Sequence, residues 1–159
     1  MRQPPGNTIA QEAMKAWRIT AAIYAVILWL ATVAGVVVSY LYDFPWSIVI
    51  AAAALSAIST YLFVFLLPKF RWRRWRYEVF EQEIYIQYGI LIVTRTLVPM
   101  MRVQHVDTKQ GPILKRFRLA TVTISTAATT HEIPALLEED ASELRDRLSA
   151  LARVDEDDV

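Results

Sequence analysis

The fold is decided by a long apolar run at residues 19–68, which reads ITAAIYAVILWLATVAGVVVSYLYDFPWSIVIAAAALSAISTYLFVFLLP. Asp43 is the only charged side chain in this run, whereas the sequence on both sides is rich in Lys, Arg, Asp and Glu. About 20 apolar residues are enough for a helix to cross the hydrocarbon core of a bilayer. The run therefore predicts two membrane spans, at residues 19–42 and 46–67, and the short connection between them makes an antiparallel helical hairpin, with Pro45 at the start of the second helix.

The composition of the chain excludes several classes of protein. Its 159 residues include no cysteine, two histidines and four glycines, and its formal net charge is +1. The absence of cysteine excludes disulfides, thiolate metal sites and a cysteine nucleophile. The spacing of the four glycines matches no phosphate-binding glycine motif. We therefore expect no catalytic residues, no metal site and no cofactor.

The basic residues beside the spans predict the orientation of the hairpin. Lys15 and Arg18 precede the first span, five basic residues follow the second, and the turn between the spans has none. Because cytoplasmic flanks carry the excess of Lys and Arg, both the N-terminal segment at residues 1–18 and the C-terminus are expected to be cytoplasmic. Aromatic side chains near the span ends are expected to lie at the membrane interfaces. They are Trp17, Tyr40, Tyr42, Trp46, Trp72 and Trp75.

Neither span contains an ionisable acid, base or histidine, so the hairpin offers no proton relay or ion site, and a transporter is not expected. Small residues are concentrated in the second span at residues 51–59. Such a patch allows another helix to approach closely, and we expect that helix to be the first span.

The sequence after the spans changes to a period of two. Following a basic juxtamembrane segment at residues 68–76, alternation at residues 83–88 and 121–125 predicts half-buried strands. A turn at Gly89, a long strand at residues 90–100, a less regular strand at 102–107 and a short strand at 131–133 that stops at Pro134 complete this pattern. Residues 113–117 are expected to form a loop or one helical turn after Gly111 and Pro112.

The end of the chain predicts one amphipathic helix. Asp140 and Glu143 resemble a capping box, and apolar residues recur with helical spacing from Leu137 to Leu151. Antiparallel strands ended by such a helix suit a small barrel whose open end the helix covers, at residues 77–153. The acidic tail at residues 154–159 is expected to be disordered.

Two segments carry a resemblance to a known family. Residues 102–127, RVQHVDTKQGPILKRFRLATVTISTA, followed by HEIP at 131–134, resemble the bacterial pleckstrin-homology (PH) family in its YdbS-like membrane branch. The match extends to the whole order of two spans, a basic segment and one α+β domain. Arg118 departs from it, because a glycine is expected there. The resemblance implies a strongly bent seven-stranded sheet with a C-terminal helix, no known catalytic activity, and a place in the bacterial inner membrane.

Two groups of basic side chains are the candidate binding residues. The first, called here the basic cluster, follows the second span with two interleaved tryptophans and favours contact with lipid over nucleic acid. The second, called the loop basic set, surrounds the Gly111-Pro112 loop and could hold an anion. The basic cluster comprises Lys69, Arg71, Arg73, Arg74 and Arg76, and the loop basic set comprises Lys109, Lys115, Arg116 and Arg118.

No catalytic constellation accompanies these groups. His131 and Glu132 are adjacent on a strand and point to opposite faces, so a structural hydrogen-bonding role is expected for His131 and likewise for His105. The sequence therefore favours a membrane-embedded, non-enzymatic adaptor that binds another membrane protein, a further PH-domain protein according to the resemblance. The alternative is a module that binds anionic lipid headgroups through the two basic groups.

Overall fold

The computed structural model describes residues 3–157, with side chains as far as residue 153. The chain divides into two compact units. One unit is the helical segment at residues 14–70, and the other combines the described residues before it with those from 71 onward. The domain is thus built from both flanks of the apolar run.

Two long helices form the first unit. Helix α1 is Ala13–Leu41, and the second helix, Trp46–Arg74, consists of α2 (Trp46–Thr60), the π-helical η1 (Tyr61–Leu66) and α3 (Leu67–Arg74). Both are long and apolar enough to cross a membrane. Each has 29 residues, so at 1.5 Å per residue it measures about 43 Å and exceeds the ~30 Å hydrocarbon core.

Polar contacts join the two helices. The hydroxyls of Thr32 and Ser56 lie 2.8 Å apart, and the indole of Trp29 donates a hydrogen bond to Thr60 Oγ1 at 3.1 Å. Ser56 is buried within the small-residue stretch, which agrees with the expectation that this patch packs against the first helix of the same chain. Pro45 directly precedes α2, as expected, at an extended backbone position.

The helices continue past the expected spans. The predicted juxtamembrane segment at residues 68–76 is mostly helix α3. Pro68 lies in its first turn, directly after the π-helical η1, and the residues that follow continue the helix to Arg74. The chain then reaches its next strand, which begins at Arg76.

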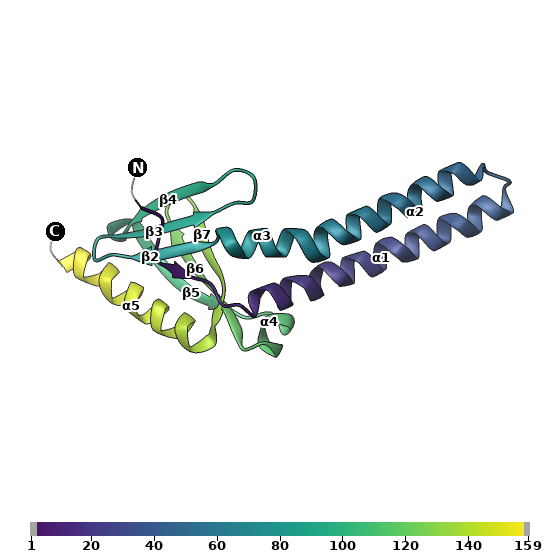
Figure 1. Cartoon of the computed structure of the whole chain (residues 1–159). Coiled ribbons are helices and arrows are strands. Elements are labelled where there is room, and N and C mark those ends of the chain that lie inside the picture. Colours follow the sequence, from purple (N-terminus) through teal and green to yellow (C-terminus); the bar gives the residue numbers. More distant parts are fainter. Residues whose placement is uncertain (1–2, 158–159) are drawn as a thin grey trace. The chain divides into compact units, whose positions relative to one another are not determined.

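Strands of the second unit form two sheets (Figure 1). Within the described residues, one sheet has the order β1-β2-β3-β4 and the other has the order β5-β6-β7, and all neighbours are antiparallel. Among the described residues the seven-strand count implied by the resemblance is confirmed, but the strands form two sheets where one was implied, and these do not close into a barrel. The strands are β1 (Asn7–Thr8), β2 (Arg76–Val79), β3 (Glu83–Tyr88), β4 (Thr94–Pro99), β5 (Val103–Lys109), β6 (Leu119–Thr126) and β7 (Thr130–Leu137).

The first strand comes from the segment that precedes α1. Asn7 pairs with Tyr77 and Thr8 pairs with Arg76, so the N-terminal segment completes the edge of the first sheet. Ile9 is buried beside this pairing. The sequence analysis named residues 1–18 only as a cytoplasmic N-terminal segment and did not predict this strand, because its partners lie too far along the chain for any local pattern to indicate them.

Strand β3 is buried on both faces. Ile84 and Ile86 are buried as expected, but so are Tyr85 and Gln87 on the opposite face. The prediction of a half-buried strand was therefore incomplete, because β3 is an inner strand between β2 and β4.

Of three further strands, two differ from the sequence prediction and one is confirmed. The long strand at residues 90–100 is wrong, since β4 begins at Thr94 and the 3₁₀ helix η2 (Met100–Arg102) follows it. The irregular strand β5 is confirmed, with a register shift between Val103 and His105. Strand β7 does not stop at Pro134, because a bulge there accommodates a residue without an N–H group, and Ala135 adopts φ 53° beside it.

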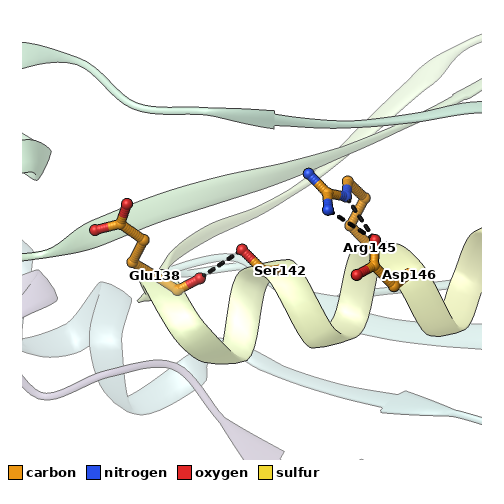
Figure 2. Close-up of polar contacts among 4 residues, drawn as sticks. All are labelled: Glu138, Ser142, Arg145 and Asp146. Carbon is orange, nitrogen blue, oxygen red and sulfur yellow. Dashed lines mark hydrogen bonds and ion pairs between the residues drawn. The ribbon is translucent and has the colours of Figure 1, made fainter.

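The C-terminal helix α5 (Glu138–Asp157) packs against β5, β6, β7 and η2. It begins before Asp140, so the predicted capping box is wrong. Instead, the first turn contains three acidic residues, whose negative charges interact favourably with the positive end of the helix dipole. Figure 2 shows Ser142 donating a hydrogen bond to the Glu138 carbonyl and Arg145 paired with Asp146. The helix continues to Asp157, so the expected disorder is wrong for that part of the tail, and residues 158–159 lie outside the described part.

Of the loop or single helical turn expected at residues 113–117, the structure has the helical turn, α4 (Pro112–Arg116). It is followed by Arg118 in the left-handed region, at φ 52°. A side chain at such a position costs about 1–2 kcal/mol, which explains why a glycine is expected there.

Replacing Arg118 with glycine is expected to raise the free energy of unfolding by up to about 1 kcal/mol, because relief of the strain exceeds the added entropy of the unfolded chain. The matched control is Lys115→Gly, within α4, which is expected to lower it by about 0.5–1 kcal/mol. Thermal unfolding of the full chain in detergent, followed by near-UV circular dichroism, measures both. Equal destabilisation by the two variants would contradict the strain argument.

Tyr77 makes the domain sensitive to high pH. Desolvation by burial raises the pKa of its phenol above the ordinary value, and the carboxylates of Asp140 and Glu143 raise it further. The folded chain therefore keeps this proton at a pH where the unfolded chain loses it, so stability falls as pH rises through the ordinary value of about 10 towards the raised one.

Replacing Tyr77 with phenylalanine is expected to reduce this loss. The decrease in Tm between about pH 9 and about pH 11 should be smaller in Tyr77→Phe than in the original chain. Tyr24→Phe, on helix α1, is the control and should behave like the original chain. An unchanged alkaline decrease in Tyr77→Phe would show that Tyr77 does not contribute.

Candidate functional site

The basic cluster lies on α3 and at the start of β2. Lys69 and Arg73 are four residues apart and share one side of the helix, while Arg71 and Arg74 share another. Arg76 begins β2, where it pairs with Gln87 on β3. The cluster is therefore spread around the helix and does not form one binding face.

The two tryptophans of this segment bind the domain. The Trp72 indole donates hydrogen bonds to the carbonyl oxygens of Ile9 (3.3 Å) and Ala10 (3.0 Å). Trp75 is buried, with only 7% of its surface exposed, and stacks on Tyr88 at a ring distance of 5.6 Å. The predicted interfacial position is wrong for Trp75, because its ring completes the domain core. Trp72 instead holds the N-terminal segment against the end of α3.

One acidic residue connects the two basic groups. Lys109 Nζ of the loop basic set lies 3.6 Å from Glu132 Oε1 on β7. Although Arg71 remains exposed, desolvation by neighbouring atoms lowers the pKa of its guanidinium, and the carboxylate of Glu132 opposes this shift. The structure thus brings Arg71 and Lys109 to the same carboxylate, which offsets part of their charge.

The rest of the loop basic set stays exposed. Lys115 and Arg116 lie on α4, and Arg118 lies in the turn that follows. These three side chains remain open to an anion.

Sequence reasoning missed one basic residue. Arg95 on β4 donates a hydrogen bond from Nε to Gln87 Oε1 at 3.0 Å. Gln87 lies directly opposite Arg95 on one side and Arg76 on the other, so the two arginines flank it on one face of the sheet. The predicted long strand concealed this arrangement, because the register of β4 was not known.

One concavity among the described residues is lined by no member of either basic group. An open groove of about 850 Å³ is lined by residues 97–99 of β4, residues 101–105 of η2 and β5, and residues 126–129 and 131 of the β6–β7 turn and β7. Leu97 and Met101 are exposed at 45% and 74% of their surfaces. Arg102 adds a positive charge to this lining.

Both histidines line the groove. His105 lies on β5 and His131 lies on β7. The structural hydrogen-bonding role expected for the two histidines stays a prediction. No group of three or more His, Asp or Glu side chains that could hold a metal occurs among the described residues.

Comparisons with known proteins identify the family. A family model described as Bacterial PH domain matches residues 18–152, which include both apolar helices and the strand domain. The chain belongs to the bacterial PH domain family. This bacterial PH protein is also 50% identical, over the full length of both chains, to the UPF0699 transmembrane protein YdbS of Bacillus subtilis (strain 168). With its two candidate spans, the likeness places it among membrane proteins.

A second relative matches part of this bacterial PH protein. The UPF0699 transmembrane protein YdbT of the same organism is 28% identical over 78 residues, which cover 48% of this chain and 16% of YdbT. No solved structure gives a significant match.

Replacing Trp72 with phenylalanine is expected to loosen the N-terminal segment. The variant loses a donor to two backbone carbonyls, worth about 1 kcal/mol, so amide exchange at residues 7–10 should accelerate about fivefold. Hydrogen exchange of the full chain in detergent measures this. Trp46→Phe, at an exposed position on α2, is the control and should leave exchange at residues 7–10 unchanged. Equal exchange in both variants would show that the Trp72 hydrogen bonds do not hold the segment.

Proposed function

We propose that this bacterial PH protein is a non-enzymatic adaptor, embedded in the bacterial inner membrane by its two helices, whose domain binds another membrane protein on the cytoplasmic side. The observation that carries the proposal is the groove between β4 and β5. It combines exposed apolar side chains with the free edges of two strands.

The groove suits a peptide segment. Within the described residues β4 pairs only with β3, and β5 pairs only with β6, so each strand has backbone groups without a strand partner along one edge. Such edges bind an added strand through main-chain hydrogen bonds, while neighbouring pockets select its side chains. Leu97 and Met101 offer apolar contacts for that segment, and Arg102 offers a contact for a carboxylate.

The topology of the chain supports presentation of the groove on one side of the membrane. Because β1 pairs with β2, the segments before the first helix and after the second belong to one unit and must share a side. Lys15 and Arg18 join the basic cluster on that side, and this excess of positive charge favours the cytoplasm.

The partner proposed is another membrane protein that contains a bacterial PH domain. This choice is supported by the partial likeness to YdbT, which shows that a segment similar to this chain also occurs within a longer transmembrane protein.

Binding of anionic lipid headgroups is the second candidate. The exposed side chains of Lys115, Arg116 and Arg118 support it, since they lie close together on α4 and its following turn. Against it, Glu132 offsets charge at Lys109 and Arg71, and the basic cluster is spread around α3. The adaptor is therefore the preferred function.

Photo-crosslinking in native membranes tests the adaptor. A photoreactive amino acid at Leu97 or Met101 is expected to form an adduct with a membrane protein that carries a bacterial PH domain, identified by mass spectrometry. The control position is Leu137, which is exposed but lies outside the groove. Met101→Asp should reduce the Leu97 adduct at least about tenfold, since a buried unpaired charge at a packed interface costs well over 1.4 kcal/mol.

Salt distinguishes the two candidates. A packed protein interface should survive purification at moderate salt, whereas headgroup binding by exposed charges should weaken steeply. Adducts only with lipid, weakened by Lys115→Gln with Arg116→Gln, would favour the headgroup module and contradict the adaptor.

A further inference from the structure

The most exposed large apolar side chains of the described chain lie in the domain. Leu91 and Ile92, in the loop between β3 and β4, are exposed at 95% and 81% of their surfaces. No large apolar side chain among the described residues of the two long helices reaches these values. Ile90 and Val93 flank the pair, so the loop, residues 89–93, is apolar throughout apart from its glycine.

The loop is a tight turn that depends on Gly89. Gly89 adopts φ 119°, a conformation that other residues rarely adopt, and a Cβ atom at Gly89 would collide with the carbonyl oxygen of Ile92. The backbone therefore folds back on itself at the base of the loop. Leu91 lies between these two residues, and the side chains of Leu91 and Ile92 are exposed.

The strand register places the loop at the end of the sheet where the chain arrives from α3. Arg76, two residues after the last residue of α3, pairs with Gln87, and Trp75 stacks on Tyr88, the residue before the loop. Strand β2 leads away from this end and β3 returns to it. The opposite end of the same hairpin carries the β2–β3 turn with Phe80.

The lengths of the two segments match. From Leu67, the last residue of the expected span, α3 rises about 10 Å to Arg74. From the Arg76–Gln87 pair, the chain extends about 10 Å to the tip of the loop. The loop and α3 are therefore of similar length, and only Trp75 lies between the end of α3 and the paired residue Arg76.

Two arginines lie behind the apolar tip. Arg76 and Arg95 flank Gln87 in one cross-strand row, and the Arg95–Gln87 hydrogen bond orients one of them. Apolar side chains at a tip with cations behind them match the two layers of a phospholipid surface, acyl chains below and phosphates above.

We propose that the loop at residues 89–93 inserts Leu91 and Ile92 into the bilayer that holds the two apolar helices, with Arg76 and Arg95 at the level of the lipid phosphates. This contact fixes the domain against the membrane at a second point beside the end of α3. The inference depends on membrane embedding and is independent of the partner bound at the groove.

The absence of cysteine from the chain makes a direct test practical. Single cysteines at Leu91 or Ile92 carry the environment-sensitive fluorophore NBD, and the full chain is placed in nanodiscs of phosphatidylcholine and phosphatidylglycerol. The matched control is Phe80→Cys, at 40% exposure on the opposite turn of the same hairpin. NBD emission at Leu91 and Ile92 should shift to shorter wavelength and be quenched several times more strongly by doxyl-labelled lipid than emission at Phe80.

Lack of lipid quenching at Leu91 and Ile92, or equal quenching at Phe80, would overturn the proposal. A blue shift that appears only after native membrane proteins are added, without quenching by lipid, would also overturn it and assign the loop to a protein partner. Near-UV circular dichroism of each labelled variant establishes that the domain is folded. The Leu97 and Met101 adducts are measured separately, so failure of the loop proposal and failure of the adaptor are distinguishable.

Discussion

The demand of two long apolar helices for a non-aqueous environment governs the rest of the molecule. In the most apolar windows of α1 and of Trp46–Arg74, the protein itself buries 0% and 6% of the residues. A bilayer can cover this surface, and it requires that the backbone satisfy its own hydrogen bonds, as a helix does. The contacts of Thr32 with Ser56 and Trp29 with Thr60 then hold the two helices together where the hydrophobic effect contributes little.

This demand leaves few residues to build a domain in water. A small domain buries a smaller share of its surface and has little stability to spare. The segment before α1 enlarges the domain: it adds β1 to the sheet, buries Ile9 and accepts the Trp72 hydrogen bonds. Trp75 is likewise drawn into the core. Residues that resemble membrane-interface anchors in the sequence thus stabilise the domain, because burial of a large ring there contributes more than contact with headgroups.

The surfaces that carry the proposed functions result from the arrangement of the strands and not from the distribution of charge. Charge alone points to the basic cluster and the loop basic set, yet Glu132 offsets part of that charge at the point where they meet. The groove is lined by residues of β4, of η2 and β5, which follow it, and of the β6–β7 turn and β7, so it combines parts of both sheets. The apolar loop arises because β4 starts late, at Thr94, and leaves Leu91 and Ile92 outside the sheet.

The sequence by itself determined the two apolar helices, the turn between them, strand β3 and the turn at Gly89, because each depends on neighbours within a few residues. After Gly111 it left a loop and one helical turn as alternatives. Only the tertiary structure decided that Asn7 and Thr8 join β2, that β7 passes Pro134 through a bulge, and that His105 and His131 meet at one groove. These features depend on pairing between distant segments, whose register is set by packing of the whole domain and leaves no local periodicity. At Arg118 the sequence already indicated a feature of the tertiary structure. The family pattern has a glycine there, and the arginine adopts the left-handed backbone conformation that glycine adopts without strain.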